Sequence, residues 1–191
     1  SAFDDFLIGS RFSDVILAGA GHDIVHGGDQ VDSLFGEEGN DLLFGDGGND
    51  ALFGGEGDDI LFGGLGDDVL SGDEGNDALF GGEGDDTLIG GAGDDILRGN
   101  AGNDLLTGNG GNDIIDGGTG DDVLNGGAGN DTLTGGDGVD VLNGDGGADT
   151  LSGGADTDTL NGGAAADTPT NRFTAQAMKS AAAADGSPPP G

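Results

Sequence analysis

Aliphatic side chains recur in this chain at every ninth position, from Leu7 to Leu160, without an insertion or a deletion. An Asp stands two positions before each of them, and the Asp series runs from Asp5 to Asp167. Glycine-rich segments lie between these pairs, so the repeating unit reads G-G-x-G-(N/D)-D-x-L-x. A period this strict indicates that each nonapeptide is one structural step of a stacked solenoid.

The x-L-x triplet of each unit predicts a short β-strand, because β-branched residues such as Val69 and Ile96 flank the Leu. Side chains alternate along a strand, so the Leu column should face inward and its two neighbours outward. The other six residues predict a loop, in which glycine permits positive φ and close backbone approach. Two units make one 18-residue turn, and about nine turns should stack at about 4.8 Å. The predicted fold class is all-β, a right-handed parallel β-roll (a β-helix solenoid).

The regularity of the loops divides the chain. Thirteen consecutive loops, from Gly36 to Asp149, keep G-x-x-G-x-D. Earlier loops are degenerate, with Phe3 and Phe12 in place of the fourth-position glycine, and beyond Thr168 the repeat ends. We therefore predict four segments. Residues 1–35 are degenerate leading repeats or an N-terminal cap, 36–152 are regular repeats, and 153–167 are degenerate terminal repeats. Residues 168–191 form a tail that is disordered or holds a short helix over 173–184.

The charge balance changes this picture. The chain holds 38 acidic and 4 basic residues, with a formal net charge of −34 and 47 glycines, a composition that is typical of disorder. Disordered acidic tails do not keep an aliphatic residue at every ninth position. Both observations hold if a counter-ion decides whether the chain folds, because metal ligation makes site assembly and folding one equilibrium.

The aspartates predict where that ion binds. The two loops of a turn lie on opposite edges, so loops two repeats apart stack, and columns such as Asp59–Asp77–Asp95 bring carboxylates together at a spacing of about 4.8 Å. A divalent cation between successive loops removes the repulsion, and carbonyl oxygens of the loop complete its shell. All-oxygen ligation indicates a hard cation, and Ca²⁺ tolerates an irregular cage better than Mg²⁺ does. Thirteen loops predict about eleven complete sites. Their ions would add roughly +22, so the net charge of the calcium-loaded chain would be roughly −12.

The stretch from Gly36 to Asp149, with units such as GGEGDDILF and GGAGNDTLT, resembles the RTX (repeats-in-toxin) family of calcium-binding nonapeptide repeats, the hemolysin-type β-roll. The resemblance implies a parallel β-roll with Ca²⁺ between adjacent loops, in bacterial proteins that leave the cell unfolded by type I secretion and fold in extracellular calcium. It also implies that loop carbonyls and the sixth-position aspartates of the intact loops bind the metal: Asp41, Asp50, Asp59, Asp68, Asp77, Asp86, Asp95, Asp104, Asp113, Asp122, Asp131, Asp140 and Asp149. The loops that end at Asp23, Asp32 and Asp158 depart from this pattern.

Phenylalanine at the ninth position is a second feature. Phe44, Phe62 and Phe80 are 18 residues apart and should form a ladder on one outer face, and Phe35 and Phe53 should form one on the other. Stacked rings stabilise neighbouring turns, or they form a docking surface for another domain or another copy of the chain. The ninth position is polar in the second half of the repeats, so such a partner would cover only the N-terminal part.

Other classes of site are disfavoured. The absence of cysteine excludes disulfides and thiolate metal sites, and no stretch approaches the about 20 apolar residues of a membrane span. Nucleic acid and anionic lipid require Lys and Arg, which are scarce. Pairs such as Asp58–Asp59 are not expected to be acid–base dyads, because neighbours on a loop rarely meet that geometry. His22 and His26 are interpreted as surface imidazoles, with metal ligation as the alternative.

The sequence thus predicts a calcium-binding structural module of a secreted or cell-surface bacterial protein, without a catalytic centre in this chain. In one version it is an accessory module of a larger exported enzyme or toxin. In a second it is a self-assembling surface or filament protein that associates through the Phe ladders. In a third it is an ice- or carbohydrate-binding adhesin, for which the sequence offers only scattered outward polar residues: Thr107, Asn125, Thr134 and Asn143.

Overall fold

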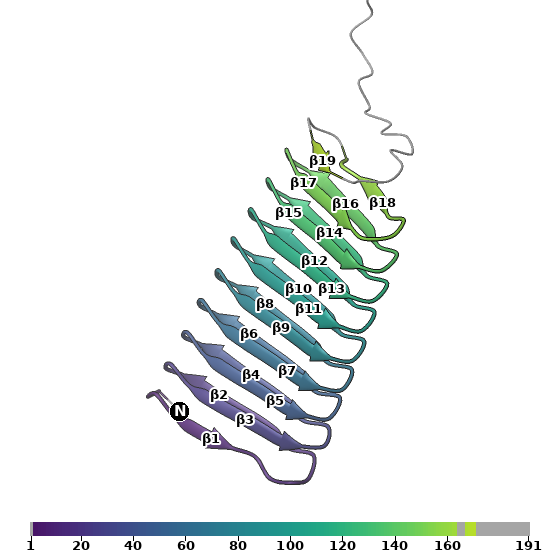
Figure 1. Ribbon diagram of the computed structural model, residues 1–191. Coiled ribbons are helices and arrows are strands. Elements are labelled where there is room, and N and C mark those ends of the chain that lie inside the picture. The colour runs from purple at the N-terminus through teal and green to yellow at the C-terminus, as the bar shows by residue number, and fades with distance from the viewer. Residues whose placement is uncertain (1, 164–166, 171–191) are drawn as a thin grey trace, which may run out of the picture.

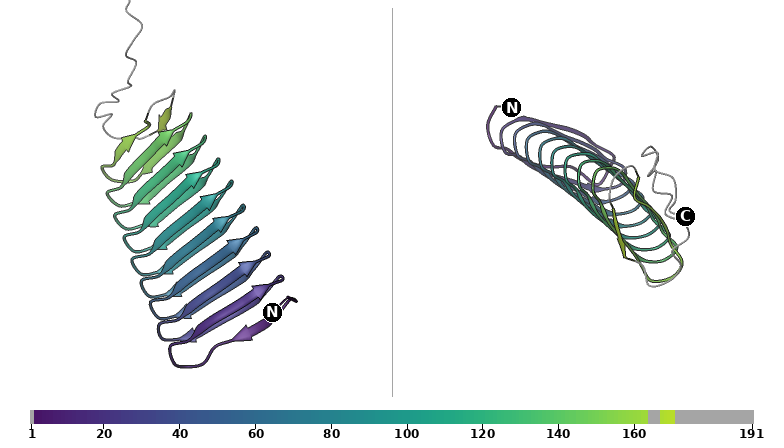
Figure 2. Two further views of the ribbon diagram at one scale, coloured as in Figure 1. Left: turned by 180° about the vertical axis from the view of Figure 1, so that it is seen from behind. Right: turned by 90° about the horizontal axis from the view of Figure 1, so that it is seen from above.

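The computed structural model describes residues 2–163 and 167–170, and all their regular structure is β (Figure 1). The chain coils into a parallel β-solenoid of about nine turns with 18 residues per turn. Seen from above, the coil is a narrow, flattened loop (Figure 2). The strands are β1 (Phe6–Ile8), β2 (Val15–Ala20), β3 (Ile24–Asp29), β4 (Ser33–Glu38), β5 (Leu42–Gly47), β6 (Ala51–Glu56), β7 (Ile60–Leu65), β8 (Val69–Glu74), β9 (Ala78–Glu83), β10 (Thr87–Ala92), β11 (Ile96–Ala101), β12 (Leu105–Gly110), β13 (Ile114–Thr119), β14 (Val123–Ala128), β15 (Thr132–Asp137), β16 (Val141–Gly146), β17 (Thr150–Gly154), β18 (Thr159–Asn161) and β19 (Thr168–Thr170).

Successive strands alternate between two sheets. The odd-numbered strands form a ten-stranded sheet, here sheet A, and the even-numbered strands form a nine-stranded sheet, here sheet B. Each strand pairs in parallel with the strand two steps along, and partners are 18 residues apart, as in Leu43↔Leu61. The predicted fold class and turn length are therefore confirmed.

Most strands are six residues long, twice the length of the predicted triplet. In β5 the ladder continues past Phe44, and Asp46 pairs with Gly64 of β7. The first three positions of each unit thus belong to the sheets, and only positions four to six turn the chain. A residue 18 positions away always offers matching N–H and C=O groups, so pairing extends as far as the backbone stays extended.

The degenerate ends continue the same ladder. β1 to β4 lie in register with the regular repeats. β19 pairs with β17, so the ladder of sheet A reaches into the segment that was predicted to be a tail. The helix predicted over 173–184 lies outside the described residues. The described part contains no helix with the length and hydropathy of a membrane span.

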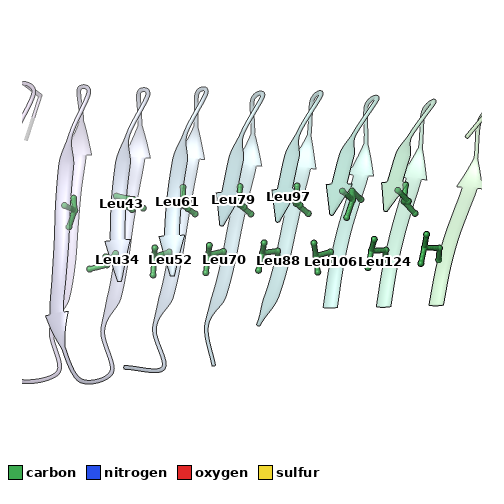
Figure 3. Close-up of a cluster of buried hydrophobic side chains, with 14 of the residues drawn as sticks. Leu34, Leu43, Leu52, Leu61, Leu70, Leu79, Leu88, Leu97, Leu106 and Leu124 are labelled. Atoms are coloured by element: carbon green, nitrogen blue, oxygen red, sulfur yellow. The ribbon is translucent and has the colours of Figure 1, made fainter. Parts of the chain in front are cut away.

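The core is a double column of aliphatic side chains between the sheets (Figure 3). From Val25 to Leu151 every eighth-position side chain is 0–1% exposed, which confirms the predicted inward face. Leu7, Ile16 and Leu160, near the two ends, are only partly buried. One side chain per nonapeptide fills the interior, so the molecule is thin and most of its other side chains lie on a surface.

The predicted aromatic ladders are present on the outer faces. On sheet A the ring centroids of Phe44 and Phe62 are 5.2 Å apart and those of Phe62 and Phe80 4.8 Å apart. On sheet B, Phe35 and Phe53 stack at 5.0 Å. All three pairs are within 10° of parallel. Each ring therefore covers the face of its neighbour and presents mainly an edge to solvent.

The polar residues that suggested an adhesin do not form one array. Thr107, Asn125 and Asn143 share a column on sheet B, whereas Thr134 lies on sheet A. The Asn143 amide donates to Asn125 Oδ1 at 2.9 Å, and the Asn125 amide donates to Thr107 Oγ1 at 3.4 Å. These groups hydrogen-bond along the column, and this leaves them fewer free donors for a ligand.

Candidate metal sites in the two loop columns

The sixth-position aspartates are buried, although aspartate is among the side chains that proteins usually expose. All thirteen predicted ligands are at most 2% exposed. They alternate between two columns, one along each edge of the solenoid, as the 18-residue turn requires. The structure therefore places carboxylates in the positions that the sequence predicts.

One oxygen of each carboxylate is held by the backbone. Asp41 Oδ1 accepts a hydrogen bond from the Asp23 N–H at 2.7 Å, and the Asp41 N–H donates to Asp59 Oδ1, also at 2.7 Å. The same contact repeats along both columns. Each aspartate thus fixes the turn before it and is fixed by the turn after it.

The other oxygen has no hydrogen-bond partner. Among the described residues, fifteen sixth-position aspartates, from Asp23 to Asp149, bury an Oδ2 atom without a protein partner. A buried, unpaired carboxylate oxygen is costly, since the charge loses water and gains nothing in return. The same unpaired oxygen recurs in loop after loop, which fits carboxylates that bind a cation rather than another protein group.

A backbone carbonyl points to the same place. A Cβ added to Gly45 would lie 2.6 Å from Asp50 Oδ2 and 2.5 Å from the carbonyl oxygen of Gly63. The carboxylate belongs to one loop and the carbonyl to the next loop of the column. The first-position glycine therefore leaves space where two oxygens from successive loops approach each other, which fits a hard cation between loops.

The fourth-position glycines bring successive loop backbones into contact. Gly57 has a φ of +129°, and a Cβ there would collide with the carbonyl oxygen of Gly39 one turn earlier. The second position is less restrictive: Asp46 and Asn100 adopt φ of 70° and 75° there, which short polar side chains tolerate. The loops thus stack too closely for a side chain at Gly57, whereas the second position admits one.

The fifth position has a role that sequence reasoning missed. Its side chains are exposed. They nevertheless accept hydrogen bonds from the next turn: Asn40 Oδ1 accepts from the Asp58 N–H at 3.2 Å, and Asp58 Oδ1 accepts from the Asn76 N–H at 2.8 Å. The Asx side chains therefore satisfy loop N–H groups that the turn leaves free. The restriction of this position to Asn and Asp in most loops was the available signal.

The two histidines occupy places in these ladders. His22 Nδ1 accepts from the Asn40 N–H at 2.8 Å, so this imidazole replaces an Asx side chain. His26 stacks on Phe44 at 4.4 Å and contacts Asp46 through Nδ1 at 3.1 Å. In residues 2–163 and 167–170 no three His, Cys, Asp or Glu side chains gather as a metal cluster.

Burial and mutual repulsion change the acidity of the columns. The pKa of Asp59 is raised to about 7: burial is the largest cause, the hydrogen bond from the Asp41 N–H opposes it, and the charge of Asp77 adds to the rise. The pKa is raised to about 7 or about 6 at central positions of both columns: Asp50, Asp68, Asp77, Asp86, Asp95, Asp113 and Asp122. Without a cation, these carboxyls therefore keep their protons to a higher pH than a free aspartate does.

Two further aspartates join the columns. Asp23 and Asp32 are each 1% exposed and carry the same unpartnered Oδ2, although their loops depart from the motif. A Cβ on Gly27 would lie 2.7 Å from Asp32 Oδ2 and 3.0 Å from the Gly45 carbonyl oxygen, so the cradle is formed there too. The unbroken Asp series was the signal for them. The departures from the motif concealed it: Ala18 at the first position of one loop and Gln30 at the fourth position of the other.

Comparison with protein families agrees with this geometry. The family model described as the RTX calcium-binding nonapeptide repeat (four copies) matches the chain in ten overlapping segments, which together cover residues 1–169. No curated protein sequence matches the chain significantly. Repeats of this family are typical of secreted bacterial proteins, and their β-roll is a structural calcium-binding fold.

Proposed function

Because the chain belongs to the family of RTX calcium-binding nonapeptide repeats, we propose that it is a structural module whose folding is coupled to Ca²⁺ binding in both loop columns. The ions lie between successive loops, and each is held by sixth-position carboxylates and first-position carbonyl oxygens. The thirteen aspartates from Asp41 to Asp149 are the proposed ligands, and about eleven ions fill the complete sites. The fifteen unpartnered carboxylate oxygens are the observation that supports this proposal most strongly.

Electrostatics explains why the ion acts as the switch. Two unit charges about 5 Å apart repel by several kcal/mol at the effective dielectric constant of a protein surface, and the repulsion recurs in both columns. In the unfolded chain the same carboxylates lie farther apart and are hydrated, so they repel each other less. A divalent ion between each pair of loops turns the repulsion into attraction and replaces the lost hydration of the carboxylates.

We place the folded module outside the cell. A site of this ligand type that works at extracellular Ca²⁺ concentrations stays empty where Ca²⁺ is scarce. The chain would then remain unfolded during export, which is compatible with type I secretion, and become rigid at its destination. Carboxylates tied up in metal binding offer no general acid or base, so any enzymatic activity would belong to another domain of a larger exported protein.

A calcium titration followed by circular dichroism tests the switch. We expect a cooperative change from coil to β-structure at about 10⁻⁴–10⁻³ M Ca²⁺, with little response to equal Mg²⁺. Isothermal titration calorimetry should count about eleven ions per chain. A β signal that persists unchanged in excess chelator would reject the proposal.

Self-association through the outer aromatic ladders is a second candidate function. It is favoured by stacked Phe columns on both sheets and by exposed aliphatic side chains beside them, such as Ile60 at 42%. A surface protein that assembles with copies of itself would use these faces. This candidate is compatible with calcium-dependent folding, because the faces exist only in the folded roll.

A further inference from the structure

One outer surface of sheet A is apolar over five neighbouring strands, β3 to β11. We call it the A face. Its seventh and ninth positions form two adjacent columns, and apart from the ends of the ninth-position column every side chain is apolar. The members are Ile24, Leu42, Ile60, Ala78 and Ile96 in one column and His26, Phe44, Phe62, Phe80 and Arg98 in the other. Contiguous apolar surface of this kind marks interaction sites in soluble proteins.

The two ends of the A face carry opposite charge. At its N-terminal end, Asp46 Oδ2 reaches back to His26 Nδ1 at 3.1 Å, and the Asp46 side chain is 45% exposed. At its C-terminal end stands Arg98, which is exposed. No carboxylate within the described residues forms an ion pair with Arg98, in a chain with 38 acidic residues. The face thus carries the Asp46 carboxylate at one end and the Arg98 guanidinium at the other, where Asp116 of β13 follows Arg98 in the same column, and it is apolar between them.

The register makes these ends equidistant from β7. His26 and Phe44 precede Phe62 in the column, and Phe80 and Arg98 follow it. A two-fold axis between two such faces, parallel to the strands and level with β7, reverses the order of strands while keeping each column opposite itself. It sets Phe62 on Phe62 and brings Arg98 of each copy to the His26–Asp46 pair of the other.

We infer that the A face binds a second copy of this chain, with the two solenoids antiparallel and Phe62 at the two-fold axis. The contact is isologous, so the charge complementarity is used twice. The other column agrees with this register, because it sets Leu42 opposite Ala78 and Ile24 opposite Ile96. Two sheets can pack face to face about 10 Å apart with such side chains between them.

The size of the face predicts a weak dimer. Five strands span about 20 Å, and the three-residue width is about 10 Å, far less than the about 800 Å² per partner of a standard interface. We therefore expect a dissociation constant of about 10 µM to 1 mM. Association requires the calcium-loaded state, since two copies with a net charge of −34 repel each other. The inference rests in this respect on the proposed function.

Sedimentation equilibrium in saturating Ca²⁺, from about 10 µM to about 1 mM chain, measures the association. The mass should rise from the 18.4 kDa of a monomer toward twice that value. Phe62→Ser, which alters both copies at the axis, should weaken the dimer at least tenfold. Phe53→Ser is the matched control, because it removes a stacked ring from the opposite sheet, and should leave the dimer unchanged.

The chain has no cysteine, so a single introduced thiol reports the register. Ile60→Cys should be joined rapidly into a covalent dimer by a bifunctional thiol crosslinker that spans about 10 Å, because Ile60 lies opposite its own copy across the gap between the two sheets. Val69→Cys on sheet B is the control, with the same 42% exposure. Arg98→Asp and Asp46→Lys should each weaken the dimer, and the double variant should restore it. Glu37, with a φ of 79° at the position equivalent to Asp46, shows that a longer side chain fits there.

Each outcome decides a separate point. A β-folded monomer at the highest concentration overturns the A face contact and leaves calcium-coupled folding intact. Failure of the chain to fold with Ca²⁺, seen by circular dichroism, overturns the proposed function instead. Assemblies larger than a dimer, equal crosslinking of both thiol variants, or no recovery in the charge-swapped double variant overturn the antiparallel isologous arrangement.

Discussion

The two halves of the solenoid share one interior and differ in their outer surfaces. Leu61 in the N-terminal half and Leu133 in the C-terminal half are both 0% exposed, within the same backbone register. On the outside of sheet A, Phe62 stacks on its neighbours in the first half, whereas the equivalent position in the second half holds the polar, half-buried Thr134. The eighth and sixth positions are therefore fixed by the fold, and the seventh and ninth are free to differ with function.

Removal of calcium should erase this difference, and it is the largest effect we expect. Both halves depend on the same two columns of aspartates, so chelation should unfold them together. The N-terminal half, with its apolar outer surface, should not stay folded alone. Hydrogen exchange followed by mass spectrometry should show loss of protection in both. Protection that survives in β3–β9 alone would mean that the aromatic ladders support a subdomain without metal.

Substitution of the interior should affect both halves equally. In saturating Ca²⁺, Leu61→Ala and Leu133→Ala should each lower the free energy of unfolding by about 2–5 kcal/mol, because each opens a cavity in a column one side chain wide. Urea denaturation measures both. A difference of more than about 1 kcal/mol between them would show that the outer surfaces contribute to how the core relaxes.

Neutralising one loop aspartate should have a smaller effect that is specific for the ion. Asp86→Asn keeps an Oδ1 acceptor but removes charge from a buried carboxylate that we propose as a ligand, so the calcium midpoint should rise several-fold. Asp85→Asn is the neighbouring control: Asp85 is exposed, and its Oδ1 accepts from the Asn103 N–H at 2.7 Å, a role that Asn can fill. Equal shifts for the two variants would contradict the assignment of the sixth position as the ligand.

Acid should restore part of the fold in calcium-free buffer. Burial raises the pKa of Asp59, Asp86, Asp95 and Asp122 to about 7, above the about 3.9 of the unfolded chain. The folded state then binds more protons, so its stability falls as pH rises through this window and recovers as pH falls. Circular dichroism should show more β-structure at about pH 4 than at about pH 8. Sodium chloride at the higher pH only screens charge, so it should restore less β-structure than acid does. If acid restored no β-structure, the raised pKa values would be contradicted.

Much of the fold and of the candidate site could be predicted from the spacing of residues. The nine-residue period gave the 18-residue turn, the inward Leu column, the outward Phe ladders and the two columns of aspartates. It worked because every unit has the same length, so one register applies to all. The length of the strands was underestimated, because the glycines of the first three positions also suit a loop, and only a neighbouring strand decides that they pair.

The sequence alone determined which residues recur and hence which share a column, because a fixed period leaves no freedom of register. Only the tertiary structure decided what each atom in a column meets. It showed that Oδ1 of the loop aspartates accepts from a backbone N–H while Oδ2 has no hydrogen-bond partner among the described residues. It showed also that Asp46 turns to His26 while Arg98 stays without a described carboxylate partner. These contacts join atoms 18 or more residues apart, and their geometry follows from the stacking of turns rather than from the residues of any single unit.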